Sequence, residues 1–173
     1  KTKIMMSHYL INWVELSQKM NKKFDVVLCR GNSLIYVDSW DKKNIPQEAK
    51  NHISKSLSEF YKIMNKGGFC YIDLTSIKEF DKPHYPLVED LGKMVLGNKK
   101  ISLKWEIYHD YGTKMRKIKN LLDIDGKIMN FTYVSYLLRH EELVSMLYEA
   151  GFKKVEKISL DGENNYNAFI AYK

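Results

Sequence analysis

The stretch that decides the fold is Phe24-Asp25-Val26-Val27-Leu28-Cys29-Arg30-Gly31-Asn32-Ser33-Leu34, an apolar run that ends in small and polar residues. A second run of this kind follows further along the chain, Gly67-Gly68-Phe69-Cys70-Tyr71-Ile72-Asp73-Leu74. Such runs are typical of strands that are buried on both faces, and therefore of a parallel sheet. Ligands of open α/β sheets bind just beyond the carboxyl ends of the strands, so we expect residues 30–33 and 73–76 to border a binding crevice.

The segment between these two strands has the pattern of a crossover helix over 47–65. Its apolar residues recur at a period near 3.6 residues and therefore lie on one face. A polar loop over 38–46 precedes it, and Gly67-Gly68 are placed to end it. We expect the strand over 24–30, this helix and the strand over 69–74 to form a right-handed parallel unit.

The second half of the chain has a different pattern. Over 98–136 apolar and polar residues partly alternate, which predicts an antiparallel three-stranded insertion that lies over the crevice. A helix over 139–150 follows, and strands over 154–160 and 166–172 are expected to form a closing antiparallel hairpin at the edge of the sheet. The sequence thus predicts a single α/β domain over 1–173, with the insertion as a subdomain that covers the substrate.

The composition is that of an ordinary globular protein, with 45% hydrophobic and 28% charged residues. No apolar run approaches the ~20 residues of a membrane helix and no signal peptide is recognisable, so we expect a cytoplasmic protein without a membrane partner. Cys29 and Cys70 fall inside predicted strands, where we expect reduced cysteines that pack in the core. The histidines are scattered, so we expect no metal site.

The net charge of +7 is compatible with a nucleic-acid partner, but the lysines are spread along the chain. This spread favours a solvated surface over a nucleic-acid site. The densest basic cluster, which consists of Lys114, Arg116, Lys117 and Lys119, is expected on a solvated face of the insertion. His109 is a candidate base, although the sequence favours a solvated histidine at the end of a strand.

The order of these elements resembles the carboxyl-terminal part of the Rossmann-like methyltransferases that use S-adenosylmethionine, and Ala150-Gly151-Phe152 resembles an ending common in that superfamily. A sharper resemblance is local. Asn12-Trp13, followed by Phe24-Asp25-Val26-Val27 and by Gly31-Asn32-Ser33, is similar to the glycine and sarcosine N-methyltransferases. In that family the Asn-Trp pair meets the adenine of the cofactor, and the Gly-Asn-Ser segment lies where the cofactor and the amino-acid substrate meet.

The resemblance implies a complete set of site residues. Those that bind the cofactor would be Asn12, Trp13, Arg30, Gly31, Ser33 and Tyr36, with Arg30 contacting it mainly through its backbone. Those that bind the substrate would be Asn32, Tyr36, Thr75 and Tyr133, of which Asn32 and Tyr133 are the expected catalytic residues. The residues alone leave alternatives open, because Asn32 also suits a turn and because Trp13 and Tyr133 also suit a core.

Three parts of the family pattern are missing from this sequence, two that hold the cofactor and one that holds the substrate. No Gly-x-Gly is present for the turn that holds the methionine part of the cofactor, and neither is the acidic residue expected to hold the ribose hydroxyls. We therefore expect that a segment carrying them precedes Lys1. The family arginine that pairs with the glycine carboxylate corresponds to about Thr75, whose hydroxyl cannot form a bidentate pair, so that Arg30 or Arg116 would have to serve instead.

The function that the resemblance implies is methyl transfer from S-adenosylmethionine to the amine of glycine or sarcosine, for betaine synthesis or methyl balance. The transfer would be a direct in-line displacement that leaves S-adenosylhomocysteine and needs no metal. Two alternatives stay open: a methyltransferase with the same cofactor that acts on RNA or another large acceptor, and a truncated domain that binds without catalysis. The sequence does not decide whether the chain forms a homo-oligomer.

Overall fold

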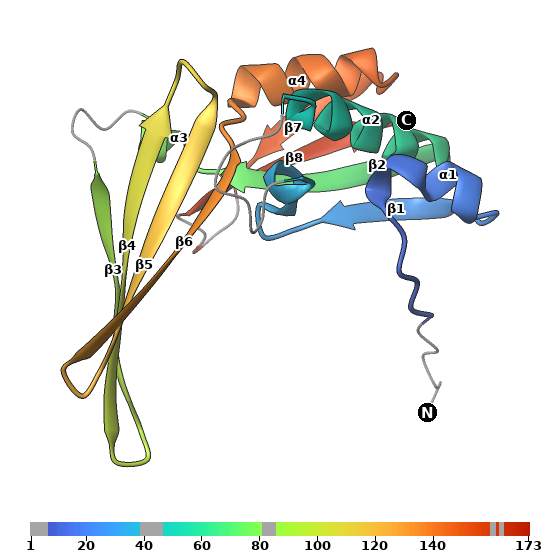
Figure 1. The fold of residues 1–173 in the computed structure, drawn as a ribbon. Coiled ribbons are helices and arrows are strands. Elements are labelled where there is room, and N and C mark those ends of the chain that lie inside the picture. The colour runs from blue at the N-terminus through green and yellow to red at the C-terminus, as the bar shows by residue number, and fades with distance from the viewer. Residues whose placement is uncertain (1–6, 39–46, 81–85, 160–161, 163–164) are drawn as a thin grey trace.

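The computed structural model describes residues 7–38, 47–80, 86–159, 162 and 165–173, and these form an α/β fold with two four-stranded sheets (Figure 1). The first sheet has the order β1–β2–β8–β7, with bounds Phe24–Cys29, Met64–Thr75, Tyr166–Tyr172 and Lys154–Ile158. The second has the order β3–β4–β5–β6, with bounds Leu87–Leu96, Lys99–Asp110, Met115–Ile124 and Lys127–Tyr136. The predicted fold class, an α/β sheet with an antiparallel insertion, is confirmed.

The first sheet contains the predicted parallel unit. Strands β1 and β2 are parallel and are connected by helix α2 (Ala49–Lys62), while β8 is antiparallel to both β2 and β7. The closing hairpin is therefore confirmed, with β7 at the edge of the sheet. Helices α2 and α4 (His140–Glu149) lie on the same face of this sheet (Figure 1). The main core lies between these helices and the sheet and includes Ile53, Leu57, Ile72, Leu143, Leu147 and Phe169.

Strand β1 is buried on one face only, so the prediction that it is buried on both is wrong. Val26 and Leu28 are 41% and 64% exposed, whereas Val27 and Cys29 pack toward the core. The physical reason is that α2 and α4 both cover the same face of the sheet. Among the described residues nothing covers Val26 and Leu28 on the opposite face. On the covered face Cys29 and Cys70 are free and buried as predicted, and burial raises the pKa of the Cys29 thiol to about 12.

Strand β2 begins at Met64, earlier than the predicted residue 69, and its two glycines lie inside the strand instead of ending the helix. A β carbon on Gly68 would stand 2.6 Å from the carbonyl oxygen of Asp25, so only glycine fits there. Gly67 has a φ of +82°, and the β1–β2 register shifts between Phe24 and Val26. The glycine pair therefore lets β2 pass close to β1 at an irregularity of the ladder.

The second sheet has four strands, so the predicted three-stranded insertion over 98–136 was too short. The missing strand is β3, in which the pairing with β4 shifts between Asp90 and Lys93 and Gly92 has a φ of +102°. This irregularity interrupts the alternation of side chains that would have revealed the strand in the sequence. The sheet stands at one end of the first sheet, and the far ends of its strands project away from the helices (Figure 1).

The remaining helical elements of the described residues are short. They are the 3-10 helices η1 (Trp13–Glu15) and η2 (Ser33–Tyr36) and the helical turns α1 (Leu16–Lys19) and α3 (Ile77–Phe80).

Most of the predicted loop over 38–46 lies outside the described residues, as does Leu160 of the predicted strand over 154–160. Within the described ranges no helix combines the length and the apolar character needed to cross a membrane, and no three His, Cys, Asp or Glu side chains are grouped to hold a metal.

Candidate functional site

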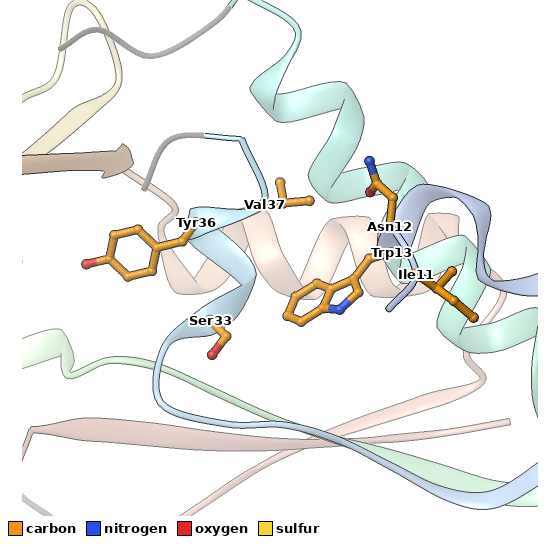
Figure 2. Close-up of a pocket in the computed structure, with 6 residues that line it drawn as sticks. All are labelled: Ile11, Asn12, Trp13, Ser33, Tyr36 and Val37. Carbon is orange, nitrogen blue, oxygen red and sulfur yellow. The ribbon is translucent and has the colours of Figure 1, made fainter. Parts of the chain in front are cut away.

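Two pockets meet at η2, just beyond the end of β1. The first has a volume of about 310 Å³ and is lined by Ile11, Asn12, Trp13, Ser33, Tyr36 and Val37 (Figure 2). The second, with a volume of about 180 Å³, lies between the end of the first sheet and the second sheet. Tyr36 lines both pockets, so its side chain lies at their junction.

The first pocket has an aromatic wall. The Trp13 indole points toward Ser33 and Tyr36 of η2 (Figure 2). It packs edge-on against Phe60 of α2, with ring centroids 5.4 Å apart. Asn12 caps η1, because its side-chain oxygen accepts a hydrogen bond of 3.3 Å from the Val14 amide. The cap and the Phe60 contact together hold the indole at the side of the pocket.

The turn between β1 and η2 is built on unusual backbone angles. Gly31 and Asn32 both have positive φ, +70° and +58°, a conformation that glycine and asparagine tolerate better than other residues. The buried carboxylate of Asp73, near the end of β2, accepts a hydrogen bond of 2.7 Å from the backbone N–H of Asn32. The side chain of Arg30 is 68% exposed and lies 3.8 Å from the other oxygen of Asp73. Asp73 thus holds the turn in place.

The side chain of Asn32 joins the ends of β1 and β2. Its amide nitrogen donates to the Thr75 hydroxyl at 2.7 Å, and its amide oxygen accepts from the Thr75 backbone N–H at 3.3 Å. Both residues are buried and both line the second pocket. This paired arrangement fixes the floor of the pocket and engages both ends of the Asn32 amide within the protein.

A buried ion pair forms another wall of the second pocket. The Arg116 guanidinium donates to both oxygens of Glu79, at 2.7 Å from Nε and 2.8 Å from Nη2. The same carboxylate accepts from His109 Nε2 at 2.6 Å, and the His109 side chain is fully buried. The expectations of a solvated His109 and a solvated Arg116 are therefore wrong. Alternation along β5 turns Arg116 inward, while the neighbouring Lys117 is exposed.

The electrostatics of this wall follow from its geometry. Burial alone would raise the pKa of Glu79, but the hydrogen bonds from Arg116 and His109 outweigh it and hold that pKa at about 2. Burial would lower the pKa of Arg116, yet Glu79 raises it above its ordinary value. Both groups are therefore charged at neutral pH and neutralise each other inside the protein. Arg116 is thus already engaged by a carboxylate.

Aromatic hydroxyls complete the second pocket. Tyr36 and Tyr133 pack edge to face with ring centroids 5.7 Å apart, and Tyr166 lines the pocket beside them. Burial raises the pKa of the Tyr36 hydroxyl, which therefore stays protonated. A protonated phenol both donates and accepts hydrogen bonds, so this wall suits a polar ligand.

The structure divides the residues singled out in the sequence between the two pockets. The predicted substrate residues Asn32, Tyr36, Thr75 and Tyr133 all line the second pocket. Of the predicted cofactor residues, Asn12, Trp13, Ser33 and Tyr36 line the first pocket and Gly31 lines the second. Arg30 belongs to the same turn, but its side chain is directed at Asp73.

Several lining residues were missed in the sequence, among them Glu79, Glu89 and Trp105. Glu89 lies on the unrecognised strand β3, and Glu79 lies in a helical turn that is too short to leave a periodic pattern. Trp105 belongs to the alternating pattern of the insertion, which placed it on a face without showing what that face covers.

No protein-family model matches the chain, and no curated protein matches its sequence. Its structure is similar to an amino pentose methyltransferase from Micromonospora echinaspora with S-adenosylmethionine bound, at 13% identity and a TM-score of 0.63, over 88% of this chain and 59% of that one. It is also similar to the CcbJ methyltransferase from Streptomyces caelestis, at 13% identity and a TM-score of 0.63, over 94% of this chain and 61% of that one.

A third similar structure is a sugar N-methyltransferase from a Streptoalloteichus species, at 15% identity and a TM-score of 0.60, over 89% of this chain and 57% of that one. The chain thus spans about three fifths of the length of the structures it matches. At these identities the likeness concerns the fold. Over most of its length, the chain has the fold of part of a methyltransferase that uses S-adenosylmethionine.

Proposed function

We propose that the chain is part of a methyltransferase that uses S-adenosylmethionine and methylates the amine of a small molecule. The observation that carries this proposal is the meeting of two pockets at Tyr36, because methyl transfer needs a donor and an acceptor held side by side. The likeness of the fold to an amino pentose methyltransferase and to a sugar N-methyltransferase supports the same reaction class.

The first pocket suits the adenine end of the cofactor. Trp13 offers an aromatic face for stacking, and Asn12 offers a side-chain amide next to it. Bound there, the cofactor would supply a methyl group on a sulfonium, from which the acceptor lone pair takes the methyl carbon while the C–S bonding pair stays on sulfur. Tyr36 and the turn over 30–33 would separate the two ligands and set their mutual orientation.

The second pocket would hold the acceptor and exclude water from it. Its volume of about 180 Å³ is below the ~300–1,000 Å³ of pockets for drug-sized ligands, so it suits a small molecule or the reacting end of a larger one. Alignment of the reacting atoms within ~3–3.5 Å is the main contribution that the protein can make to such a displacement. The hydrogen-bonded floor of Asn32 and Thr75 would provide that alignment.

The acceptor that we favour is an amine on a small hydroxylated molecule such as an amino sugar. Two of the similar structures are those of an amino pentose methyltransferase and a sugar N-methyltransferase. Arg116 is paired with Glu79, which leaves it poorly suited to clamp an amino-acid carboxylate. Glycine or sarcosine is the second candidate, and it is supported by the local resemblance around Asn12-Trp13 and Gly31-Asn32-Ser33.

The test uses the native protein with methyl-labelled S-adenosylmethionine and separate acceptors: glucosamine and other amino sugars, glycine, sarcosine and bulk RNA. We expect label on an amino sugar. Label on glycine or sarcosine would replace the favoured acceptor with the second candidate, and label on RNA would overturn the small-molecule proposal. Failure of the protein to bind S-adenosylhomocysteine, measured by calorimetry, would overturn the cofactor assignment itself.

Replacing Trp13 with alanine is expected to weaken S-adenosylhomocysteine binding about tenfold, because stacking on an aromatic side chain is worth ~1–3 kcal/mol per base. Trp13→Phe keeps a ring and should retain most of the affinity. Calorimetric titration of both variants measures the difference, and the urea midpoint reports the loss of the Phe60 contact separately. Equal affinity in Trp13→Ala and the unaltered protein would assign the indole to packing alone.

A further inference from the structure

Glu89 and Trp105 lie side by side on the face of the second sheet that borders the second pocket. They are direct cross-strand partners on β3 and β4, and both line that pocket. Directly opposite residues of an antiparallel pair project from the same face with their side chains adjacent. Neither residue is needed for the pairing of Asn32 with Thr75 or for the ion pair of Glu79 with Arg116.

The Trp105 indole nitrogen is a buried donor that finds no acceptor in the described part of the chain. The ring itself is held in place, because it packs against the small core formed by Leu87, Ile107 and Ile118. Buried indole N–H groups normally have a partner, and an unpaired one is costly. Trp105 also lines the second pocket, so an acceptor atom on a bound ligand would supply the partner that its indole N–H lacks.

The Glu89 carboxylate is the second polar group of this wall for which the described residues supply no partner. It is half-buried and, within the described residues, forms no ion pair or hydrogen bond. The charges of Glu79 and Arg116 cancel each other, so Glu89 leaves the described wall with a net negative charge. A half-buried carboxylate is best satisfied by a cation or by hydroxyl donors.

We propose that Glu89 and Trp105 form the acceptor-recognition site of the second pocket and select a cationic, hydroxylated amine over an amino acid. In this arrangement Glu89 binds the ammonium group or neighbouring hydroxyls, and the Trp105 N–H donates to a hydroxyl or ring oxygen. Before the transfer the ammonium releases one proton to Glu89 or to water, which frees the nitrogen lone pair that takes the methyl group. A free carboxylate on the ligand would be repelled by Glu89. The inference rests on the proposed function, since it names the substrate class of that same pocket.

Glu89→Gln tests the charge with a matched control. Asp90, the next residue of β3, is exposed and accepts a hydrogen bond of 2.9 Å from the Gly92 amide, so Asp90→Asn removes the same charge outside the pocket. We expect the KM for glucosamine to rise about tenfold in Glu89→Gln and to stay unchanged in Asp90→Asn. The affinity for S-adenosylhomocysteine should be the same in both variants.

Trp105→Phe tests the indole donor, and replacement of Trp105 by β-(3-benzothienyl)alanine removes the N–H while keeping the shape of the ring. We expect both to raise the KM for glucosamine about five- to tenfold, while the benzothienyl variant keeps the urea midpoint of the unaltered protein. An unchanged KM in the benzothienyl variant would overturn the role of the indole.

Calorimetric binding of glucosamine to the native protein separates failure of this inference from failure of the proposed function. Binding that Glu89→Gln weakens supports the recognition site, even if no methyl group is transferred. Methyl transfer to glucosamine with equal KM values in Glu89→Gln and Asp90→Asn would overturn the recognition site and leave the proposed function standing. If glucosamine does not bind while glycine does, both the site and its substrate class are wrong.

Discussion

Replacing Glu79 with glutamine is expected to lower the free energy of unfolding by about 3–5 kcal/mol. Arg116 is 5% exposed, and Glu79 neutralises it through two hydrogen bonds of 2.7 and 2.8 Å. Without that carboxylate the guanidinium would stay buried with no counter-charge, and the partner of His109 Nε2 would be a neutral amide oxygen in place of a carboxylate. Urea unfolding followed by circular dichroism measures the loss.

Glu106→Gln is the matched control for this prediction. Glu106 pairs with Lys119 at 3.2 Å on the same sheet, but the two side chains are 23% and 36% exposed, so we expect a loss below about 1 kcal/mol. The double replacement of Glu79 by leucine and Arg116 by methionine should recover much of the stability, because it removes both buried charges together. Equal losses in Glu79→Gln and Glu106→Gln would show that Arg116 is not held by Glu79.

The pH dependence of stability gives a second readout of the same pair. The pKa of Glu79 is about 2 in the folded protein, against an ordinary value of 4.5. As the pH falls below about 5, the carboxylate is therefore protonated in the unfolded chain before it is protonated in the folded protein. The stability that Glu79 contributes is therefore fully present above about pH 5 and is lost as the pH falls toward 2. Glu79→Gln should lack this part of the acid slope, while Glu106→Gln should retain it.

The sequence predicted the elements whose patterns are local. The apolar run over 24–30, the periodic helix before Gly67 and the alternating strands after residue 98 all form where their hydrophobic spacing indicates. What could not be predicted depends on contacts between distant segments. Gly68 was assigned to a helix end because its close approach to Asp25 appears only once β1 and β2 are paired.

The same distinction between local patterns and contacts of distant segments applies to the residues of the candidate site. The residues of the turn over 30–33 could be singled out because a polar cluster after a buried strand indicates the edge of a crevice. The wall formed by Glu79, His109 and Arg116 could not, since its members lie far apart in the sequence and only the packing of the second sheet brings them together. Charge alone indicated a solvated Arg116, because no local pattern identifies a buried ion pair.

Replacing Asn32 with alanine is expected to lower the rate of methyl transfer about 100-fold in the native protein, because misplacement by about 1 Å can cost that much. Asn32 has a φ of +58°, and its side chain makes both hydrogen bonds to Thr75. Alanine disfavours this backbone conformation by about 1–2 kcal/mol and leaves the Thr75 amide without its acceptor. We therefore expect a measurable loss of stability together with the loss of rate.

Two further variants separate the backbone angle from the side-chain bonds. Asn32→Gly accepts the positive φ without strain, so it should recover the urea midpoint in part but not the rate. Thr75→Val removes only the hydroxyl that accepts from Asn32, and we expect a rate loss of about tenfold with the turn intact.

Rates are measured with labelled S-adenosylmethionine and the acceptor that the unaltered protein methylates. If Asn32→Gly restores the full rate, the turn matters only through its backbone, whereas unchanged rates in all three variants would remove Asn32 from the site. If the rate falls in Thr75→Val while the urea midpoint stays unchanged, the loss is due to the amide–hydroxyl bond, because the hydroxyl that accepts from the Asn32 side chain is the group that this variant lacks.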